Sequence, residues 1–262
     1  INFLLVGLPD NAVKESQQRI ASALNYYGYK IPGKKIVINM APADLKKEGS
    51  AYDLPLAIGI LGASEQICTD KLADYIVMRE LSLDGSLNKI KGALPIALEA
   101  KKQGFKGIIL PKCNAKEAAI VSDLEVFGAD TILDVINFFD GQNTLERTFI
   151  DIHEEFAKSL DNYEFDFIDV KGQESVKRAM EVAAAGSHNI IMVGAPGSGK
   201  TMLAKRLPSI LPPLTIEEAL ETTKIHSVAG KMSVNQSIVS VRPFRNPHHT
   251  ISDTALVGGG SY

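Results

Sequence analysis

The stretch Gly194-Ala195-Pro196-Gly197-Ser198-Gly199-Lys200-Thr201 matches the pattern G-x-x-x-x-G-K-[ST] without a gap. The apolar run before it predicts a strand over residues 189–193, and the residues behind it predict a helix over 202–207. Such a loop binds phosphate groups when it joins a strand to a helix in this way. The stretch therefore predicts the beginning of an α/β domain built around a phosphate-binding loop.

The chemistry of phosphate binding explains each residue type in this loop. Glycines allow backbone N–H groups to turn inward around a β-phosphate, and the following helix adds the positive end of its dipole. The Lys200 ammonium is expected to reach the β- and γ-phosphates, and the Thr201 hydroxyl to bind Mg²⁺. We predict ATP and Mg²⁺ as cofactors, held by all eight residues of the loop.

Length and composition narrow the class of protein. The 262 residues favour two domains, and the formal net charge of -3 does not indicate a nucleic-acid binder in bulk. Cys68 and Cys113 lie far apart, which argues against a disulfide framework or a structural zinc site. No apolar run is long enough for a membrane span, so we expect a cytoplasmic protein with no membrane partner. The absence of an initiator Met, and the short sequence after the loop, make us expect a fragment.

The pattern of apolar residues predicts two domains joined by a linker. Residues 1–145 mix helices, strands and a hairpin turn at Asp84-Gly85, as in an α+β domain. Residues 146–165 are polar and weakly patterned, and 166–262 form the first portion of the α/β domain. Strands are expected at 1–7, 35–40, 75–83, 107–111 and 124–127, and helices at 10–27, 54–63, 93–103, 115–122, 131–139, 152–160 and 174–185.

A basic segment follows the loop. Residues 222–252 contain no Asp or Glu, in a chain that is acidic as a whole. Cations there could contact nucleic-acid phosphates, although a solvated loop or a subunit contact explains the composition equally well. A metal site at the two histidines is disfavoured, because adjacent side chains diverge and no third ligand has useful spacing. The candidate DNA contacts are Lys231, Arg242, Arg245, His248 and His249.

Several longer strings resemble one protein family. In the first half these are Val6-Gly7-Leu8-Pro9, Asn39-Met40-Ala41-Pro42-Ala43-Asp44-Leu45-Lys46-Lys47-Glu48-Gly49 and Tyr52-Asp53-Leu54-Pro55. In the second half they are Gly172-Gln173-Glu174, the phosphate-binding loop, Arg242-Pro243-Phe244-Arg245-Asn246-Pro247-His248-His249 and Val257-Gly258-Gly259-Gly260. In order and spacing they resemble the bacterial magnesium-chelatase-like AAA+ proteins of the ComM/YifB competence group, over essentially the whole chain.

The resemblance implies a fold and an activity. It implies a Lon-protease-like domain, similar to ribosomal S5 domain 2, followed by the first part of a P-loop AAA+ domain. Val170, Gly172 and Gln173 would border the adenine, and the basic segment would face the pore of a homo-hexameric ring through which DNA passes. Full-length members would be ATPase motors of the helicase type, acting in DNA branch migration. The Walker B acid and the arginine finger would lie beyond Tyr262, so this chain should bind nucleotide without efficient hydrolysis.

Three other functions stay open on the residues. The chelatase kinship allows the motor subunit of a metal chelatase, and a scaffold that senses nucleotide is a further alternative. A Lon-like protease would need a serine–lysine pair, for which Ser50 and Lys91 are the nearest candidates. The Lon pattern, however, places its serine at Ala51 and its lysine near Leu94, so both catalytic positions are occupied by other residues.

Overall fold

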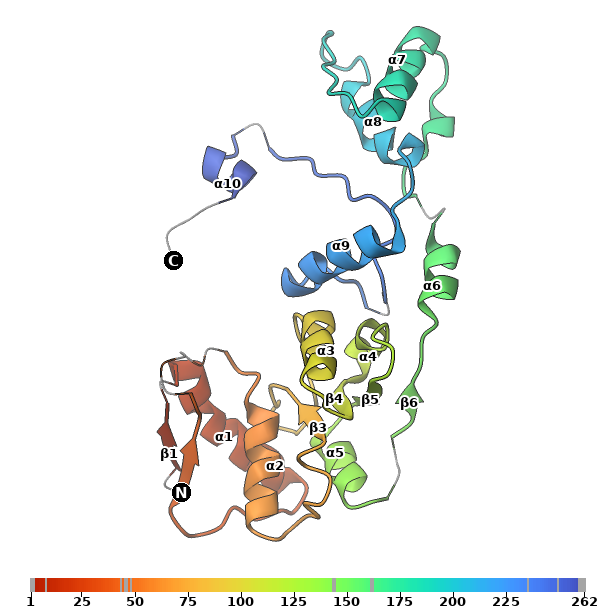
Figure 1. Cartoon of the computed structure of the whole chain (residues 1–262). Helices are drawn as coiled ribbons and strands as arrows, with labels where there is room; N and C mark the ends of the chain where they lie inside the picture. The colour runs from red at the N-terminus through yellow and green to blue at the C-terminus, as the bar shows by residue number, and fades with distance from the viewer. Residues whose placement is uncertain are drawn as a thin grey trace. The chain divides into compact units, whose positions relative to one another are not determined.

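The computed structural model describes residues 3–7, 9–42, 44, 47, 49–142, 145–160, 163–234, 236–248 and 250–258. The chain divides into two compact units (Figure 1). The first comprises Ile1–Glu155 with Leu220–Ile238, and the second comprises Phe156–Ala219 with Val239–Tyr262. Across the described ranges, no helix is both long enough and apolar enough to cross a membrane.

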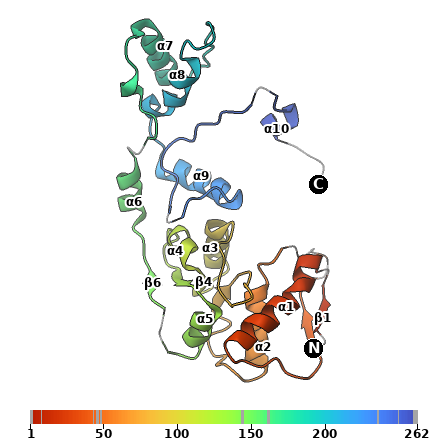
Figure 2. The same cartoon turned by 180° about the vertical axis from the view of Figure 1, so that it is seen from behind.

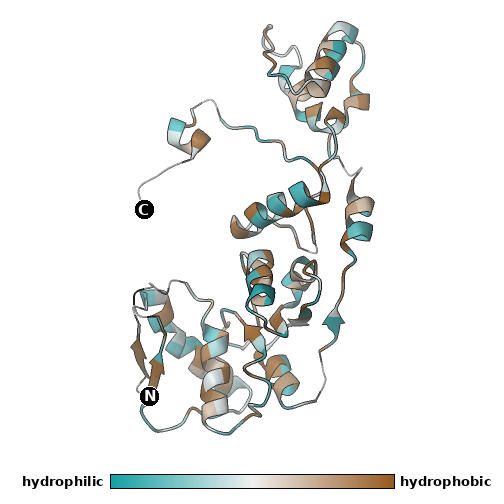
Figure 3. Cartoon of the chain, viewed as in Figure 1, coloured by the Kyte–Doolittle hydropathy of each residue, from teal (hydrophilic) through white to brown (hydrophobic). Residues whose placement is uncertain are grey.

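The first unit opens with a small parallel sheet. Strand β1 (Phe3–Val6) pairs in parallel with β2 (Ile36–Asn39), and helix α1 (Asn11–Tyr26) connects them. The helix begins where a carboxylate can cap it, because an Asp10 oxygen accepts the Val13 N–H at 2.8 Å. Both strands are mostly apolar (Figure 3), which agrees with the strands and the helix expected from the sequence.

A second sheet has the order β3-β4-β5-β6. The first three strands run in parallel, and β6 (Arg147–Thr148) joins β5 in the antiparallel sense. The expected strand over 75–83 ends early, because Leu81 instead pairs with Leu87 across the turn predicted at Asp84-Gly85. The other elements of this region are α2 (Asp53–Ala63), β3 (Tyr75–Val77), α3 (Ala93–Lys102), β4 (Gly107–Pro111), α4 (Lys112–Ala118), β5 (Glu125–Ala129) and α5 (Ile132–Phe139).

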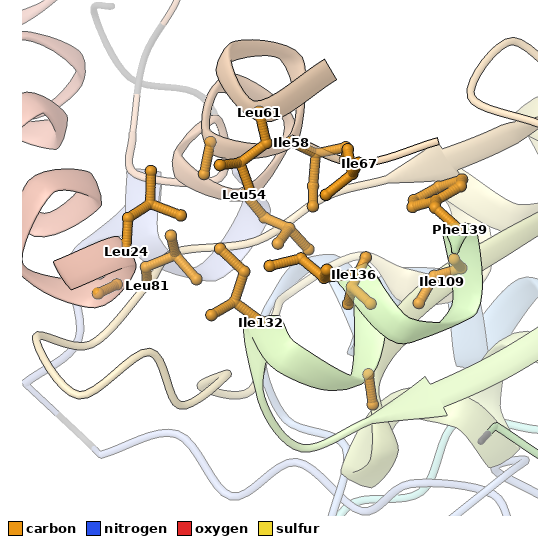
Figure 4. Packing of buried hydrophobic residues seen from close by; sticks show 14 of the residues in the cluster. Leu24, Leu54, Ile58, Leu61, Ile67, Leu81, Ile109, Ile132, Ile136 and Phe139 are labelled. Carbon is orange, nitrogen blue, oxygen red and sulfur yellow. The ribbon is translucent and has the colours of Figure 1, made fainter. Parts of the chain in front are cut away.

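The core of the first unit lies between α2, α5 and the second sheet (Figure 4). Helix α2 is apolar on most of its circumference, so it can be buried on several sides. Burial of a full aliphatic side chain contributes about 1.5–3 kcal/mol each, which makes this cluster the main source of the unit's stability. The labelled members are Leu24, Leu54, Ile58, Leu61, Ile67, Leu81, Ile109, Ile132, Ile136 and Phe139.

Residues 220–238, called the docked segment below, belong to the first unit although they follow the phosphate-binding loop in sequence. The segment contains the end of α9 (Ile216–Val228), which lies beside α3 and α4 in Figures 1 and 2. The Ser227 hydroxyl donates to the buried Glu117 carboxylate, and the Gly92 N–H donates to the Ser227 carbonyl at 3.1 Å. The prediction had placed every residue from 166 onward in one domain, whereas these contacts group the docked segment with the first unit.

The second unit has a small core of its own. It comprises Phe167, Val170, Met180 and Leu203, each at most 7% exposed. These residues join η1 (Phe167–Asp169), α7 (Glu174–Ala185) and α8 (Lys200–Arg206), and η2 (Leu207–Ile210) continues from α8. The unit also holds the second half of α6 (Ile152–Ser159), the first turn of α9, and α10 (Asp253–Val257).

The strand expected over 189–193 is not formed. Its residues lie in no ladder, and within the described part of the second unit no sheet is present. Ile191 is 87% exposed and Val193 is 90% exposed. The sequence identified a segment with the apolar, β-branched composition of a strand, but a strand also requires hydrogen-bonded neighbours, which these residues do not have.

Candidate nucleotide-binding site

The phosphate-binding loop turns on two glycines with left-handed backbone. Gly197 has φ of +78° and Gly199 has φ of +86°, a region that other residues adopt only with strain. Helix α8 then begins at Lys200. The glycines of the motif thus sit where the backbone requires them, and the chain can change direction sharply before the helix.

The Lys200 ammonium lies inside this turn. Its Nζ donates to the Gly194 carbonyl at 2.8 Å, to the Ala195 carbonyl at 2.7 Å and to the Ser198 hydroxyl at 3.3 Å. The side chain is half-buried. The loop therefore places a positive charge at the centre of its own backbone, next to the residues that would surround a phosphate.

Backbone donors around this charge are available to an anion. Ser198 donates its N–H to the Ala195 carbonyl at 3.3 Å, but the N–H groups of Gly197, Gly199, Lys200 and Thr201 have no acceptor among the residues described. Several free N–H groups near one ammonium are the donor set that phosphate oxygens require. Because the Thr201 hydroxyl is also exposed, the loop fits a nucleotide triphosphate with a bound Mg²⁺.

The structure brings Gln173 to the same loop. Its Nε2 lies 3.8 Å from the position that a Cβ on Gly199 would take. Gly172 and Gln173 both have positive φ, +66° and +57°, so the chain turns there and directs α7 away from the loop. Val170 is 5% exposed and packs in the small core, against the same helix α8 that begins in the loop. Of the three residues that the resemblance assigns to the adenine, Gln173 thus lies beside the loop and Val170 packs against α8, and the assignment itself stays a prediction.

Long-range contacts that were not predicted from the sequence hold the C-terminal end of α8. Arg206 Nη2 lies 3.4 Å from an Asp169 oxygen, and the Phe167 N–H donates to the Ser209 hydroxyl at 2.9 Å. Phe165 has two cations over its ring, Lys205 Nζ and Arg206 Cζ, both 5.4 Å from the centroid. These contacts join segments about forty residues apart, so no local pattern could have indicated them.

The predicted DNA contacts are distributed over both units. Lys231 belongs to the docked segment of the first unit, whereas Arg242, Arg245 and His248 belong to the second unit. His249 lies outside the described residues.

The candidate DNA-contacting residues of the second unit have different local contacts. Arg242 is engaged by the Pro212 carbonyl at 2.7 Å and by Glu218 at 3.4 Å, and the His248 ring lies 2.8 Å from the Thr250 hydroxyl. Arg245 is exposed, with no hydrogen bond or ion pair within the part of the chain that the structure describes.

The serine and lysine considered for a protease have separate partners. The Ser50 hydroxyl donates to Glu80, and the Lys91 side chain approaches Gly230 in the docked segment. Leu94, at the position expected for a catalytic lysine, is fully buried. A search of the described residues also finds no group of three His, Cys, Asp or Glu side chains that could hold a metal ion.

Comparison with known proteins identifies the family. A family model described as "Subunit ChlI of Mg-chelatase" matches residues 1–114, and one described as "Magnesium chelatase, subunit ChlI" matches residues 166–262. The chain is 44% identical over 259 residues to the competence protein ComM of Haemophilus influenzae, covering 99% of this chain and 50% of the relative. It is 46% identical over 257 residues to the YifB protein of Escherichia coli, covering 98% of this chain and 49% of the relative.

One further similarity is weaker and covers less of the chain. An archaeal Lon protease of Halobacterium salinarum is 26% identical over 110 residues, which cover 42% of this chain and 16% of the relative. This similarity and the mixed α/β structure fit the predicted class in broad terms, while the likeness to ribosomal S5 domain 2 stays a prediction. The chain spans about half the length of the ComM and YifB relatives it matches. It belongs to the magnesium-chelatase-like AAA+ family that includes ComM and YifB.

Proposed function

We propose that this chain binds Mg-ATP at residues 194–201 and supplies the nucleotide-binding loop of an ATP-driven motor that processes DNA. The observation that carries the proposal is the set of unpaired N–H groups arranged around the Lys200 ammonium. These N–H groups would donate to phosphate oxygens, and Lys200 would exchange the Gly194 and Ala195 carbonyls for the β- and γ-phosphates. The Thr201 hydroxyl would be a ligand of Mg²⁺, which neutralises charge on the phosphates when it is bound.

The adenine would lie on the side of the loop occupied by Gln173. The left-handed turn at Gly172 and Gln173 brings an amide side chain next to Gly199, and the amide can both donate and accept hydrogen bonds. Val170 contributes the apolar base of the same corner. We infer that these three residues orient the nucleoside while the loop holds the phosphates.

Hydrolysis by this chain should be slow or undetectable. Hydrolysis requires a carboxylate that holds Mg²⁺ and orients water, usually with an arginine near the γ-phosphate. Of the carboxylates after the loop, Glu218 contacts Arg242, Glu221 contacts Lys224, and Glu217 lies with Glu218 in the first turn of α9. Asp253 begins the short helix α10, in a polar stretch with no apolar strand before it. We therefore expect binding without efficient turnover, and hydrolysis in the full-length protein.

The nucleic-acid part of the proposal rests on the basic segment and on the family. One relative is named a competence protein, which fits the expected role in DNA processing. Within the segment, Arg245 is able to reach a phosphate, because it is exposed and has no partner among the described residues. A homo-hexamer in the cytoplasm, with DNA passing through its pore, is the assembly we propose for the full-length protein.

Isothermal titration calorimetry tests the ATP site. Lys200→Ala removes charge-assisted hydrogen bonds worth about 1.5–3 kcal/mol, which corresponds to about 10- to 150-fold weaker Mg-ATP binding. Arg178→Ala is the matched control, because it removes an exposed positive charge from α7, where Arg178 pairs with Glu181 at 3.1 Å. Equal affinities in the Lys200→Ala variant and the wild type would refute the assignment of the loop.

DNA binding is tested separately by fluorescence anisotropy with a labelled single-stranded oligonucleotide. Arg245→Ala should weaken binding and lower the salt slope by about 0.7 if one phosphate contact is lost. In the full-length protein, stimulation of ATP hydrolysis by single-stranded or branched DNA would favour the DNA motor. Hydrolysis that DNA does not change would favour the chelatase-type motor, and absence of hydrolysis would favour a nucleotide-sensing scaffold.

A further inference from the structure

Arg79 is a charged residue that lies entirely inside the first unit. Its side chain is among the largest that are fully buried. Arg79 follows the end of β3 by two residues, so it sits at the carboxyl edge of the parallel strands β3, β4 and β5. Its Nε donates to the Glu80 carbonyl at 2.8 Å, but Nη1 and Nη2 are buried without any hydrogen-bond partner.

No carboxylate among the described residues accepts a hydrogen bond from the two outer nitrogens of Arg79. Asp53 accepts from Arg19 at 2.6 and 3.0 Å, and from the Leu81 N–H at 3.1 Å. A Glu80 side-chain oxygen accepts from Ser50. Glu80 and Cys113 are the ionisable groups close enough to act on Arg79 electrostatically, and Cys113 follows the end of the neighbouring strand β4 by two residues. Within the described residues, Nη1 and Nη2 thus have no hydrogen-bonded anion.

Deprotonation of Arg79 does not relieve the cost of burying its charge. Burial lowers the pKa of Arg79 to about 10, so the guanidinium stays charged at neutral pH. A buried charge with unpaired donors is strongly unfavourable unless an acceptor satisfies it. The outer two nitrogens of a guanidinium form a planar fork, which matches two oxygens of one carboxylate, phosphate or sulfate group.

We propose that Arg79 anchors a binding site for a small oxyanion at the carboxyl edge of β3 and β4 in the first unit. Ligands of parallel sheets commonly bind beyond the carboxyl ends of the strands, which is where Arg79 and Cys113 lie. Ser50, Glu80 and Cys113 are only half-buried, so the site lies close below the surface. The depth of the guanidinium favours an anion of the size of phosphate, sulfate or a carboxylate group.

Thermal unfolding of the full 262-residue chain tests this proposal independently of ATP binding. All proteins carry Lys200→Ala, so that the loop in the second unit does not bind the added phosphate. Phosphate, sulfate and acetate are compared with chloride at constant ionic strength, with and without Arg79→Met. Because sulfate and phosphate stabilise proteins non-specifically, only the increase in Tm that Arg79→Met abolishes counts as binding.

The expected result has two parts. At least one oxyanion should raise the Tm of the Arg79 protein and not that of the Arg79→Met protein. In chloride, Arg79→Met should be as stable as its parent or more so, because methionine removes an uncompensated charge. A response to phosphate or sulfate alone identifies an inorganic anion, whereas a response to acetate identifies a carboxylate. No anion-dependent difference between the two proteins overturns the proposal, whatever the stability of Arg79→Met.

Labelling of Cys113 locates the bound anion. In a Cys68→Ser background, which removes the exposed second thiol, iodoacetamide should alkylate Cys113. If the anion covers the thiol, an anion concentration of about ten times its Kd should slow alkylation by about tenfold. Stabilisation with unchanged alkylation would place the anion elsewhere and overturn the assignment to this edge of the sheet.

Discussion

Replacing Ser227 with alanine tests how the docked segment is held on the first unit. Ser227 is 2% exposed and its hydroxyl donates to Glu117, which is 3% exposed. In the Ser227→Ala variant, Glu117 keeps the Leu94 N–H at 3.0 Å and the Asn114 amide at 3.3 Å, but loses its hydrogen bond to the docked segment. A hydrogen bond to a charged group contributes about 1.5–3 kcal/mol, so opening of the segment should become about 10- to 150-fold more frequent.

Amide hydrogen exchange measures this opening directly. The Gly92 N–H donates to the Ser227 carbonyl at 3.1 Å, and the Lys231 N–H donates to the His226 carbonyl at 2.8 Å. Both amides should exchange faster in Ser227→Ala by that factor, while amides in β4 stay protected. Ser233→Ala is the control, because Ser233 is an exposed serine of the same segment. Unchanged exchange at both amides would show that the Ser227–Glu117 contact does not hold the segment.

Two further substitutions probe the loop and the core of the first unit. Gly199→Ala leaves space for its Cβ, 3.5 Å from Met202 Cε, but a left-handed alanine costs about 1–2 kcal/mol, so Mg-ATP should bind about 5- to 30-fold more weakly by calorimetry. Gly104→Ala, at φ +81° in the first unit, should leave that affinity unchanged. Burial and a 2.6 Å hydrogen bond to Glu125 raise the pKa of Tyr75. The folded state then holds the phenol proton more tightly than the unfolded state, so stability falls as pH rises above about 10, and urea unfolding should show that Tyr75→Phe reduces this loss.

Local signals predicted the helices of the first unit well. Asp10 caps α1 and Thr131 caps α5 within a capping box, and both helices begin within one residue of the expected positions. Helix α9 was missed, although Thr215 and Glu218 form the reciprocal hydrogen bonds of the same motif at its beginning, at 3.0 and 3.2 Å. A search for Thr followed three residues later by Glu would have found it.

Long-range contacts could not be predicted in this way. The loop was identified residue by residue, because its function is encoded in eight consecutive positions. The pairing of Ser227 with Glu117 joins residues 110 positions apart, and no periodicity relates them. The lack of hydrogen-bond partners on the outer nitrogens of Arg79 is equally invisible in sequence, because it depends on which side chains the fold brings around a buried residue. The sequence alone does not show which charged groups compete for the same partner.

The same competition for partners bears on the Lon-like fold that the sequence predicts for the first unit. A serine–lysine dyad requires a hydroxyl next to a base that can accept its proton. Ser50 instead donates to Glu80, and the position expected for the lysine is the buried Leu94. The buried Arg79 guanidinium in the same unit is already protonated, so it cannot act as a base, but it can attract anions. The first unit therefore does not pair Ser50 with a lysine base, and peptidase activity that Ser50→Ala abolishes in the full-length protein would contradict the prediction that no such dyad acts here.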